Sequence, residues 1–377
     1  MNRTIRGVAT AVVLALGLAG CGTAPPTATD KAAHGKSEGA KALEKVYAEL
    51  EGLTGEKRLK RLVELAAKEK GSLSLYTSTN VDESGPITEE FSDKYGIDVD
   101  LYRASSSDVL QRLLQEAQTS YAGADVVAVN GPEMQILDHE KLLLPLETPT
   151  KGDLVKAAQY PNWAGMYLNV FVAAWNTKLV KSPPQSWEEV LSGDVGSGKL
   201  AMELGDWDWF ATLVTQYFMA EKGMSEDEAV ELFRNAARKS VVVDGHTTMA
   251  ELLAAGEFSM VTSAYQHRIP RLRAEGAPVA WEAPVEPIIV RPNGIGIYRD
   301  TDRPASALLF VEYGLTDAQK LLAEMERTPA NPKYGGVPEK YEMVTVDLAK
   351  LVDERKKWED LYESVVRESG SDVVKGK

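Results

Sequence analysis

The chain has 377 residues, of which 44% are hydrophobic and 26% are charged, so it is long enough for two lobes that each bury a core. Its formal net charge of −14 repels nucleic acid, and the sequence has no basic stripe interleaved with aromatic residues. We therefore expect an ordinary globular protein that binds no nucleic acid.

The N-terminus has the order of a secretory signal, because Arg3 and Arg6 precede an apolar run over residues 8–18. This run is shorter than the roughly 20 residues that a membrane-spanning helix needs. It closes on Leu18-Ala19-Gly20-Cys21, which resembles the lipobox of bacterial lipoproteins. The resemblance implies that residues 1–20 are a signal peptide and that Cys21 carries acyl chains. A plain signal peptide with an accidental cysteine is the alternative.

Cys21 is the single cysteine of the chain, so the fold has no intramolecular disulfide. Residues 21–39 are rich in Thr, Ala, Pro, Gly, Lys and Ser, which predicts a flexible tether. The expected product is an exported monomer, anchored through its lipid to the membrane at the cell envelope.

Residues 40–70 have the three- and four-residue leucine spacing of helices, and Gly52 and Gly55 divide them into two. After Gly71, strands and helices alternate. Strands are predicted over residues 72–76, 97–102, 124–129 and 166–175, and helices over 87–95, 108–120 and a short stretch after Pro132. This alternation predicts an α/β fold whose mixed, mostly parallel sheets are flanked by helices.

A proline-containing segment, Ser182-Pro183-Pro184, begins a different region. Helices are predicted there over residues 187–192, 207–222, 226–238 and 249–255, with strands over 240–243, 258–262 and 287–298, and later helices over 305–313, 317–325 and 347–366.

These elements assemble most simply into two lobes joined by two crossing strands, which would act as a hinge. Lobe 1 is predicted to comprise residues 71–172 and 287–346, and lobe 2 residues 173–286. Residues 347–377 would form a C-terminal helix and tail. A cleft between two such lobes is the default place for a ligand.

Several segments resemble the ferric-ion type of periplasmic solute-binding protein. They are Leu73 to Ser78, Ala124 to Val127, Leu253 to Glu257 followed by Thr262 to Tyr265, and Asn293 to Gly296. Relatives of this type serve ATP-driven (ABC) importers for ferric ion, thiamine, phosphonates and similar solutes. The resemblance covers roughly residues 71–368 and implies the type II periplasmic-binding fold, solute capture and an ABC permease as partner.

The sequence departs from the iron binders of that family. Ferric binders often present adjacent tyrosines on the loop that matches residues 264–267, together with a histidine after the first strand. Here Tyr265 stands alone, Gln266 fills the neighbouring slot, and Asn80 stands near the histidine position. This departure argues against direct ferric binding, and no cofactor is expected; if a metal is bound, Tyr265 and His267 are the predicted ligands.

Polar segments follow the predicted strands, where helix N-termini present free N–H groups to a ligand. The residues concerned are Thr77, Ser78, Thr79, Asn80, Asn130, Gly131, His246 and Thr247, and Asn293 joins the predicted ligand-binding residues from the segment Asn293 to Gly296 that carries the family resemblance. Each also has a plain structural reading, because hydroxyls and amides before helices often serve only as caps. Thr248 and Glu251, for example, have the spacing of a capping box.

The run Asp206-Trp207-Asp208-Trp209 has two interpretations. Its carboxylates and indole faces could contact a cationic ligand. Alternatively, Asp206 caps the next helix, Asp208 complements the helix dipole, and the tryptophans pack inside. A mixed arrangement, with one tryptophan buried and one on the cleft wall, is also consistent with the sequence.

Tyr265-Gln266-His267-Arg268 is the strongest predicted ligand patch, because it follows an apolar strand. Arg268 offers a fork suited to a carboxylate or phosphate, although it could instead pair on the surface with Glu275 or another acid. We predict that Tyr265→Ala and Arg268→Ala weaken ligand binding without unfolding the protein.

The predicted function is solute capture for an importer, without catalysis; a secreted enzyme on the same scaffold and a sensor or scaffold lipoprotein are the alternatives. Two enzyme motifs match by letters only. Gly35 to Gly39 fits G-x-S-x-G but lies in the tether, and Gly193 to Lys199 fits a phosphate loop except that Leu200 replaces the Ser or Thr. An anionic or zwitterionic organic solute is favoured, with a ferric ion or metal chelate second.

Overall fold

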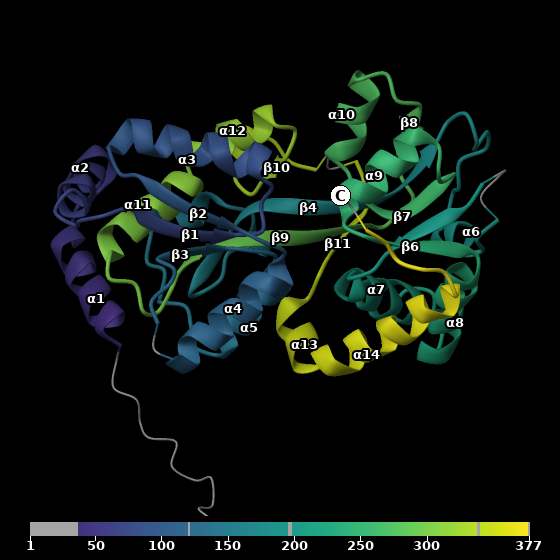
Figure 1. Ribbon diagram of the computed structural model, residues 1–377, viewed down its shortest axis with the longest axis horizontal. Helices are drawn as coiled ribbons and strands as arrows, with labels where there is room; N and C mark the ends of the chain where they lie inside the picture. Colours follow the sequence, from purple (N-terminus) through teal and green to yellow (C-terminus); the bar gives the residue numbers. More distant parts are fainter. Residues whose placement is uncertain (1–36, 120, 195–197, 338–339, 376–377) are drawn as a thin grey trace, which may run out of the picture. The chain divides into compact units, whose positions relative to one another are not determined.

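One mixed sheet runs through the part of the chain that this computed structural model describes, which is residues 37–119, 121–194, 198–337 and 340–375 (Figure 1). The predicted signal peptide, Cys21 and most of the tether lie outside these residues. Among the described helices, none combines the length and the apolar character needed to cross a bilayer.

The sheet has a parallel block of strands on each side of two central antiparallel strands. Along the sheet, the path of strands is β12 (Val374–Lys375), β6 (Ser240–Asp244), β5 (Leu200–Glu203), β7 (Met260–Tyr265), β4 (Trp163–Asn176), β9 (Ile288–Ile297), β3 (Val126–Ala128), β1 (Leu73–Thr77) and β2 (Val99–Arg103). We call the part built on β1, β2 and β3 the first lobe, and the part built on β5, β6, β7 and β12 the second lobe.

The two central strands, β4 and β9, connect the lobes. They pair from Trp163 opposite Gly296 to Phe171 opposite Ile289. Beyond Phe171, β4 continues into the second lobe and pairs with β7, whereas the end of β9 pairs with β3 in the first lobe. Every residue of both strands is buried. This arrangement confirms the predicted two-lobed α/β fold with two crossing strands.

Three short strands complete the sheet. β8 (Val279–Ala280) and β10 (Thr328–Pro329) pair with β4, and β11 (Met343–Thr345) pairs in parallel with β9.

Helices cover both faces of the sheet in the first lobe. Successive residues of a strand point to opposite faces, so each strand contributes to two hydrophobic clusters. Leu75 and Val126 face one cluster, and their neighbours Tyr76 and Val127 face the other. The first cluster is closed by α1 (Glu38–Leu50), α2 (Gly55–Ala66), α3 (Val81–Tyr95), α11 (Pro304–Gly314) and α12 (Ala318–Glu324), and the second by α4 (Ser106–Thr119) and α5 (Gly131–His139) (Figure 1).

The second lobe is covered in the same way. One face carries α9 (His246–Ala255) and α10 (Arg268–Ala274). The other carries α6 (Trp187–Leu191), α7 (Trp207–Thr212), its π-helical continuation η3 (Leu213–Met219), α8 (Glu226–Arg238), α13 (Leu348–Asp353) and α14 (Arg355–Val366). Helix α14 thus packs on the second lobe, where Phe210 lies 5.2 Å from Tyr362 between ring centroids, whereas α13 also packs against α5 of the first lobe.

Some expected elements differ from those observed. The helix expected over 347–366 is two helices, because the backbone leaves the helical region at Glu354 (φ −101, ψ 10). Ser37 accepts a hydrogen bond from the Ala40 N–H and starts α1 at Glu38, slightly before the predicted end of the tether. β5 and α10 were not expected at all. The residues at which the lobes divide stay a prediction.

Candidate functional site

A cleft of about 970 Å³ lies at the carboxyl ends of the strands and is lined by both lobes and the central strands. The first lobe contributes Ser78, Asn80, Arg103, Ser105–Asp108, Asn130, Pro132 and Glu133; the second contributes Glu203–Trp207, His246, Thr247, Thr248 and Tyr265; and the central strands contribute Tyr167, Asn169, Arg291 and Asn293. Most of these side chains are polar, so the cleft suits a polar ligand.

The floor of the cleft is formed by alternate residues of the central strands. Tyr167 and Asn169 of β4, and Arg291 and Asn293 of β9, are spaced two apart and therefore share a face. The Asn130 side-chain oxygen joins the floor by accepting from Asn169 Nδ2 (3.1 Å) and Asn293 Nδ2 (3.2 Å). This network fixes the amides, while Asn293 Oδ1 is buried without a hydrogen-bond partner among the described residues.

Arg291 is held by a carboxylate beneath the floor. Its Nη1 donates to both oxygens of Asp208 (2.9 and 2.7 Å), and its Nη2 donates to the Tyr265 hydroxyl (2.9 Å). Its guanidinium lies 4.7 Å above the Phe171 ring. Burial alone would lower the pKa of Arg291, but Asp208 outweighs burial and raises it. The Arg291 charge is therefore neutralised within the protein.

A second arginine, Arg327, is neutralised in the same manner. Its Nε and Nη2 donate to the two oxygens of Glu83 on α3 (3.0 and 2.6 Å), and its Nη1 donates to Asn169 Oδ1 (3.2 Å). The guanidinium also lies 4.6 Å from the centroid of the Tyr167 ring. Neither buried arginine of the cleft is left as a free cation.

Glu203, Asp206 and His246 form a cluster on the wall of the second lobe. His246 Nε2 lies 3.1 Å from Asp206 Oδ1, and the two Glu203 oxygens accept from the backbone N–H groups of Gly205 (2.5 Å) and Gly245 (3.0 Å). Burial, and then the Asp206 charge, raise the pKa of Glu203 to about 7. Burial lowers the pKa of His246, but the neighbouring carboxylates outweigh it and raise it.

A further carboxylate, Glu133, lies at the start of α5 on the first-lobe side. Its Oε2 atom is buried and has no hydrogen-bond partner among the described residues. Burial raises the pKa of Glu133 to about 7, although Arg291 opposes this shift. The cleft therefore contains buried acceptors that the protein does not satisfy.

Nine of the predicted site residues line the cleft: Ser78, Asn80, Asn130, Asp206, Trp207, His246, Thr247, Tyr265 and Asn293. Thr77 and Thr79 lie beneath it, where Thr77 donates to the Ala128 carbonyl (2.8 Å) and the Thr79 hydroxyl contacts the Tyr167 hydroxyl (3.0 Å). Gly131 serves packing, because a Cβ there would lie 2.7 Å from Leu348 Cδ1.

The Asp206–Trp209 run combines both of its interpretations. Trp207 is 9% exposed on the cleft wall, whereas Trp209 is fully buried, with its ring 5.6 Å from that of Trp187. Asp206 stands at the N-cap of α7, but its side chain makes no capping hydrogen bond. Asp208 lies in the first turn and is bound to Arg291.

Of the predicted patch at 265–268, only Tyr265 lines the cleft. Gln266 and His267 directly precede helix α10, which begins at Arg268, and a role of these three residues in ligand binding stays a prediction. Arg268 is buried and pairs with an acid other than Glu275, Glu251 (3.3 Å), as the alternative interpretation allowed, and Gln266 does not line the cleft. His267 is buried 3.9 Å from Glu83, and burial, followed by Arg327, holds its pKa well below the ordinary value.

Two further expectations are corrected by this geometry. Burial raises the pKa of Tyr265, and its hydroxyl accepts from Arg291, so the structure does not support a Tyr265–His267 metal pair. The capping box of Thr248 and Glu251 is also wrong, because α9 begins at His246 and Thr248 already lies in its first turn.

Four important residues were missed by sequence reasoning: Glu133, Glu203, Arg291 and Arg327. Arg291 carried a usable signal, because a single charge inside the apolar strand 288–297 needs a partner. Glu203 could have been found only with β5, the four-residue strand that it ends. Arg327 lies between α12 and β10, where no pattern identifies it.

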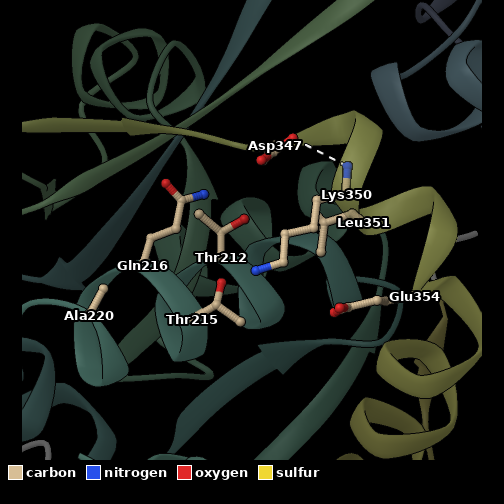
Figure 2. A pocket seen from close by; sticks show the side chains of 8 residues that line it. All are labelled: Thr212, Thr215, Gln216, Ala220, Asp347, Lys350, Leu351 and Glu354. Atoms are coloured by element: carbon tan, nitrogen blue, oxygen red, sulfur yellow. Dashed lines mark hydrogen bonds between the residues drawn. The ribbon is translucent and has the colours of Figure 1, made fainter. Parts of the chain in front are cut away.

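A smaller pocket of about 360 Å³ lies between η3 and α13 (Figure 2). Its polar side chains have structural tasks. Asp347 accepts from the Lys350 N–H at the start of α13 (3.2 Å), Glu354 accepts from the Trp358 indole (2.8 Å), and Thr215 donates to the Ala211 carbonyl (2.7 Å). The large cleft is therefore the better candidate site.

Comparisons with known proteins give a matching family and a shared fold. Residues 87–343 match the family model described as bacterial extracellular solute-binding protein. A search of curated protein sequences gives no significant match.

Similar solved structures are periplasmic binding proteins. AfuA from Actinobacillus pleuropneumoniae, with fructose-6-phosphate bound, is 19% identical, covers 79% of this chain and 99% of its own, and has a TM-score of 0.69. Apo ferric ion-binding protein A from Pasteurella haemolytica is 16% identical, covers 80% of this chain and 100% of its own, and has a TM-score of 0.67. Iron-bound HitA from Pseudomonas aeruginosa is 18% identical, covers 78% of this chain and 99% of its own, and has a TM-score of 0.64. At these identities the likeness establishes a shared fold.

Proposed function

The chain belongs to the bacterial extracellular solute-binding protein family, and we propose that it captures a small polar solute in its cleft and delivers it to the permease of an ATP-driven importer. The observation that carries the proposal is the polar cleft of about 970 Å³, which both lobes line. A solute bound there would contact both lobes at once, so that binding would favour a closed arrangement.

Two contacts already reach across the rim of the cleft. Asn80 Nδ2 lies 3.5 Å from Thr247 Oγ1, and Arg271 of α10 lies 3.5 Å from Asp82 of α3. Both contacts are long, and the ion pair is exposed, so each stabilises closure only weakly. These two rim contacts support a cleft whose closure depends on the contacts that a solute adds, while His267 near Glu83 and Leu348 beside Gly131 also join the two lobes.

The charges in the cleft favour a solute that brings hydrogen-bond donors or positive charge. Arg291 and Arg327 are both engaged by protein carboxylates. Among the described residues that line the cleft, the buried atoms without partners are three carboxylate or amide oxygens, Asp206 Oδ2, Glu133 Oε2 and Asn293 Oδ1, and one donor, Arg291 Nε. A buried acceptor left unpaired costs about 1–3 kcal/mol, which a donor on the solute would relieve. We therefore favour a zwitterion or a cation over a purely anionic solute.

The proposal is tested by solution scattering and calorimetry with a panel of polyamines, thiamine, amino acids, metal salts, phosphonates and organic acids. We expect one class to bind and to reduce the radius of gyration. Asn80→Ala and Thr247→Ala should weaken that binding about 5- to 20-fold, since each removes a polar contact. Thr215→Ala, in the smaller pocket of Figure 2, is the matched control. A body that never contracts with any member of the panel would refute capture by closure.

Membrane anchoring through Cys21 is part of the proposal, supported by the lipobox-like sequence Leu18 to Cys21. Cells that express the full chain should incorporate a labelled fatty acid into it. Cys21→Ser should abolish the label and release the protein from the membrane fraction. Equal labelling of both proteins would show that the cysteine is accidental.

A further inference from the structure

The cluster on the second-lobe wall brings three donor groups together from two loops. Glu203 ends β5, Asp206 precedes α7, and His246 is the first residue of α9. One ligand-type atom from each lies within 4.8 Å of the others. All three residues line the cleft, so the cluster faces the space in which a solute would bind.

The imidazole of His246 is oriented as in a metal ligand. Its Nδ1 lies 2.9 Å from the Ser263 carbonyl oxygen, so Nδ1–H donates there, and Nε2 lies at hydrogen-bond distance (3.1 Å) from Asp206 Oδ1, which is the contact that a metal ion would replace. Metal-binding histidines in proteins almost always donate their second ring N–H to such an acceptor, which fixes the tautomer. The Tyr265 ring, 3.9 Å away between centroids, packs beside the imidazole.

The two carboxylates are also pre-positioned. Gly245, at φ +99, adopts a backbone that favours glycine and directs its N–H at Glu203 Oε1 (3.0 Å). Asp206 is 1% exposed, and its Oδ2 has no hydrogen-bond partner among the described residues. Such an orphaned carboxylate oxygen is costly in a protein interior, and a cation would satisfy it.

We propose that Glu203, Asp206 and His246 bind a divalent first-row transition-metal ion, such as Zn²⁺, Mn²⁺ or Co²⁺, as the cargo or as the metal of a chelated cargo. Two carboxylates and one imidazole suit such ions, and a dication that displaces the proton shared by His246 and Asp206 would balance the two carboxylate charges. Three protein ligands leave coordination positions open towards the cleft for water or a chelator. This inference rests on the proposed capture function and names its solute class.

The test is equilibrium dialysis of the full chain, stripped of metal by a chelator, against Zn²⁺, Mn²⁺ or Co²⁺. Bound metal is counted by mass spectrometry, and the visible spectrum of Co²⁺ reports its ligands. We expect one ion per chain. Asp206→Asn, Glu203→Gln and His246→Gln should each weaken binding at least about tenfold.

Matched controls lie far from the cluster. His139→Gln and Asp98→Asn remove an exposed imidazole and an exposed carboxylate, and they should leave metal affinity unchanged. Each variant is first checked for folding by circular dichroism, and three independent ligand variants keep the test decisive if one fails to fold. Lack of a stoichiometric ion, or wild-type affinity in the folded ligand variants, would overturn the proposal.

A second arm of the experiment separates the two sources of the metal. The same dialysis is run with the metal alone and with its citrate complex. Binding of the metal alone identifies the bare ion as cargo, and binding only with citrate identifies a chelate. In both cases the three ligand variants must bind less metal than the wild type. If the variants bound the citrate complex as tightly as the wild type does, the proposed metal site would be wrong.

The metal site and the capture function fail in distinguishable ways. If no metal binds but another solute makes the chain contract in solution scattering, the metal site is wrong and capture stands. If one metal binds per chain but neither it nor any other solute produces contraction, the metal site stands and capture by closure is wrong.

Discussion

At the residue scale, the buried pair of Arg291 and Asp208 supports the cleft floor from below. Their side chains are 5% and 1% exposed, and the guanidinium also bonds Tyr265 on the second lobe. Because the two charges satisfy one another away from water, removal of either leaves the other uncompensated in the interior.

We therefore expect Arg291→Met to lower the free energy of unfolding by about 3–5 kcal/mol, because Asp208 is left buried and unpaired. Urea unfolding measures this change. The double variant Arg291→Met/Asp208→Asn should recover much of the loss, since it leaves no unpaired charge. A single variant as stable as the wild type would show that the pair has no structural role.

Glu133 predicts a dependence of stability on pH. Its pKa is raised by burial to about 7 in the folded protein, against an ordinary value near 4.5, with Arg291, Asp208 and Arg355 as charged neighbours. The folded state therefore holds a proton that the unfolded state has lost between about pH 4.5 and 7. In this window the Glu133 contribution to stability falls as pH rises.

Glu133→Gln should accordingly be about 1–3 kcal/mol more stable than the wild type at pH 8 and nearly equal to it at pH 4. Chemical unfolding at the two pH values measures the difference. The control Glu89→Gln removes an exposed carboxylate from α3. If Glu133→Gln changed the stability equally at both pH values, the raised pKa of Glu133 would be contradicted.

At the element scale, β4 and β9 pack closely because a glycine faces an aromatic ring. A Cβ at Gly294 would lie 2.4 Å from the Trp163 ring, so a methyl group there would force the indole or the strand to move. The Trp163 ring is itself stacked on Tyr160 at 3.7 Å between centroids, which leaves it little freedom.

Gly294→Ala should therefore lower the free energy of unfolding by about 1–3 kcal/mol through overpacking. Gly152→Ala is the matched control. Gly152 lies in the short helix Pro149–Asp153, its backbone is outside the left-handed region, and no atom beyond its chain neighbours lies within 4 Å of its Cβ position, so alanine should be neutral or should stabilise the protein by up to about 1 kcal/mol. Thermal unfolding of both variants measures the difference in stability, and equal effects of the two substitutions would refute the overpacking at Gly294.

The elements that the sequence predicts well are those with a strong local pattern. Helix α8 has its capping box at Ser225 and Glu228 and matches the predicted bounds. The strands β4 and β9 were found because they are continuous apolar runs. In contrast, β5 has four residues and α10 has Pro270 in its first turn, so neither has a pattern that stands out from a loop.

The same reasoning explains which site residues could be found. Residues such as Asn80 and His246 follow strands and were found by position along the chain. Arg327, Glu83 and Asn169 come from three distant segments that only the folded chain brings together. The position of Arg268 depends on helix α10, which the sequence did not predict. For this reason the sequence placed Arg268 at the ligand site, whereas the structure places it outside the cleft lining.

At the scale of the whole molecule, the contact between Arg271 and Asp82 joins α10 of the second lobe to α3 of the first. Both side chains are about half exposed, so the pair is screened by salt and is worth less than about 1 kcal/mol. Its effect should appear in the balance between open and closed forms and not in global stability.

Arg271→Ala should increase the ratio of open to closed molecules in the solute-free protein by up to about fivefold, since a 1 kcal/mol contact limits the shift. Energy transfer between fluorophores on the two lobes measures the ratio, and higher salt should reproduce the effect in the wild type. Arg273→Ala, an exposed arginine on the same helix, is the control. An equal shift in both variants would show that general charge, not this contact, is responsible.

The strands that join the lobes also supply the cleft floor, with Tyr167 and Asn169 on one and Arg291 and Asn293 on the other. Insertion of one residue into either strand would reverse the facing of every side chain beyond it and replace the floor by apolar residues. In descendants of this chain, loops outside the cleft can therefore change in length, whereas a change in the length of β4 or β9 would displace the floor residues together. New specificities should arise by substitution on these strands and by indels confined to the rim.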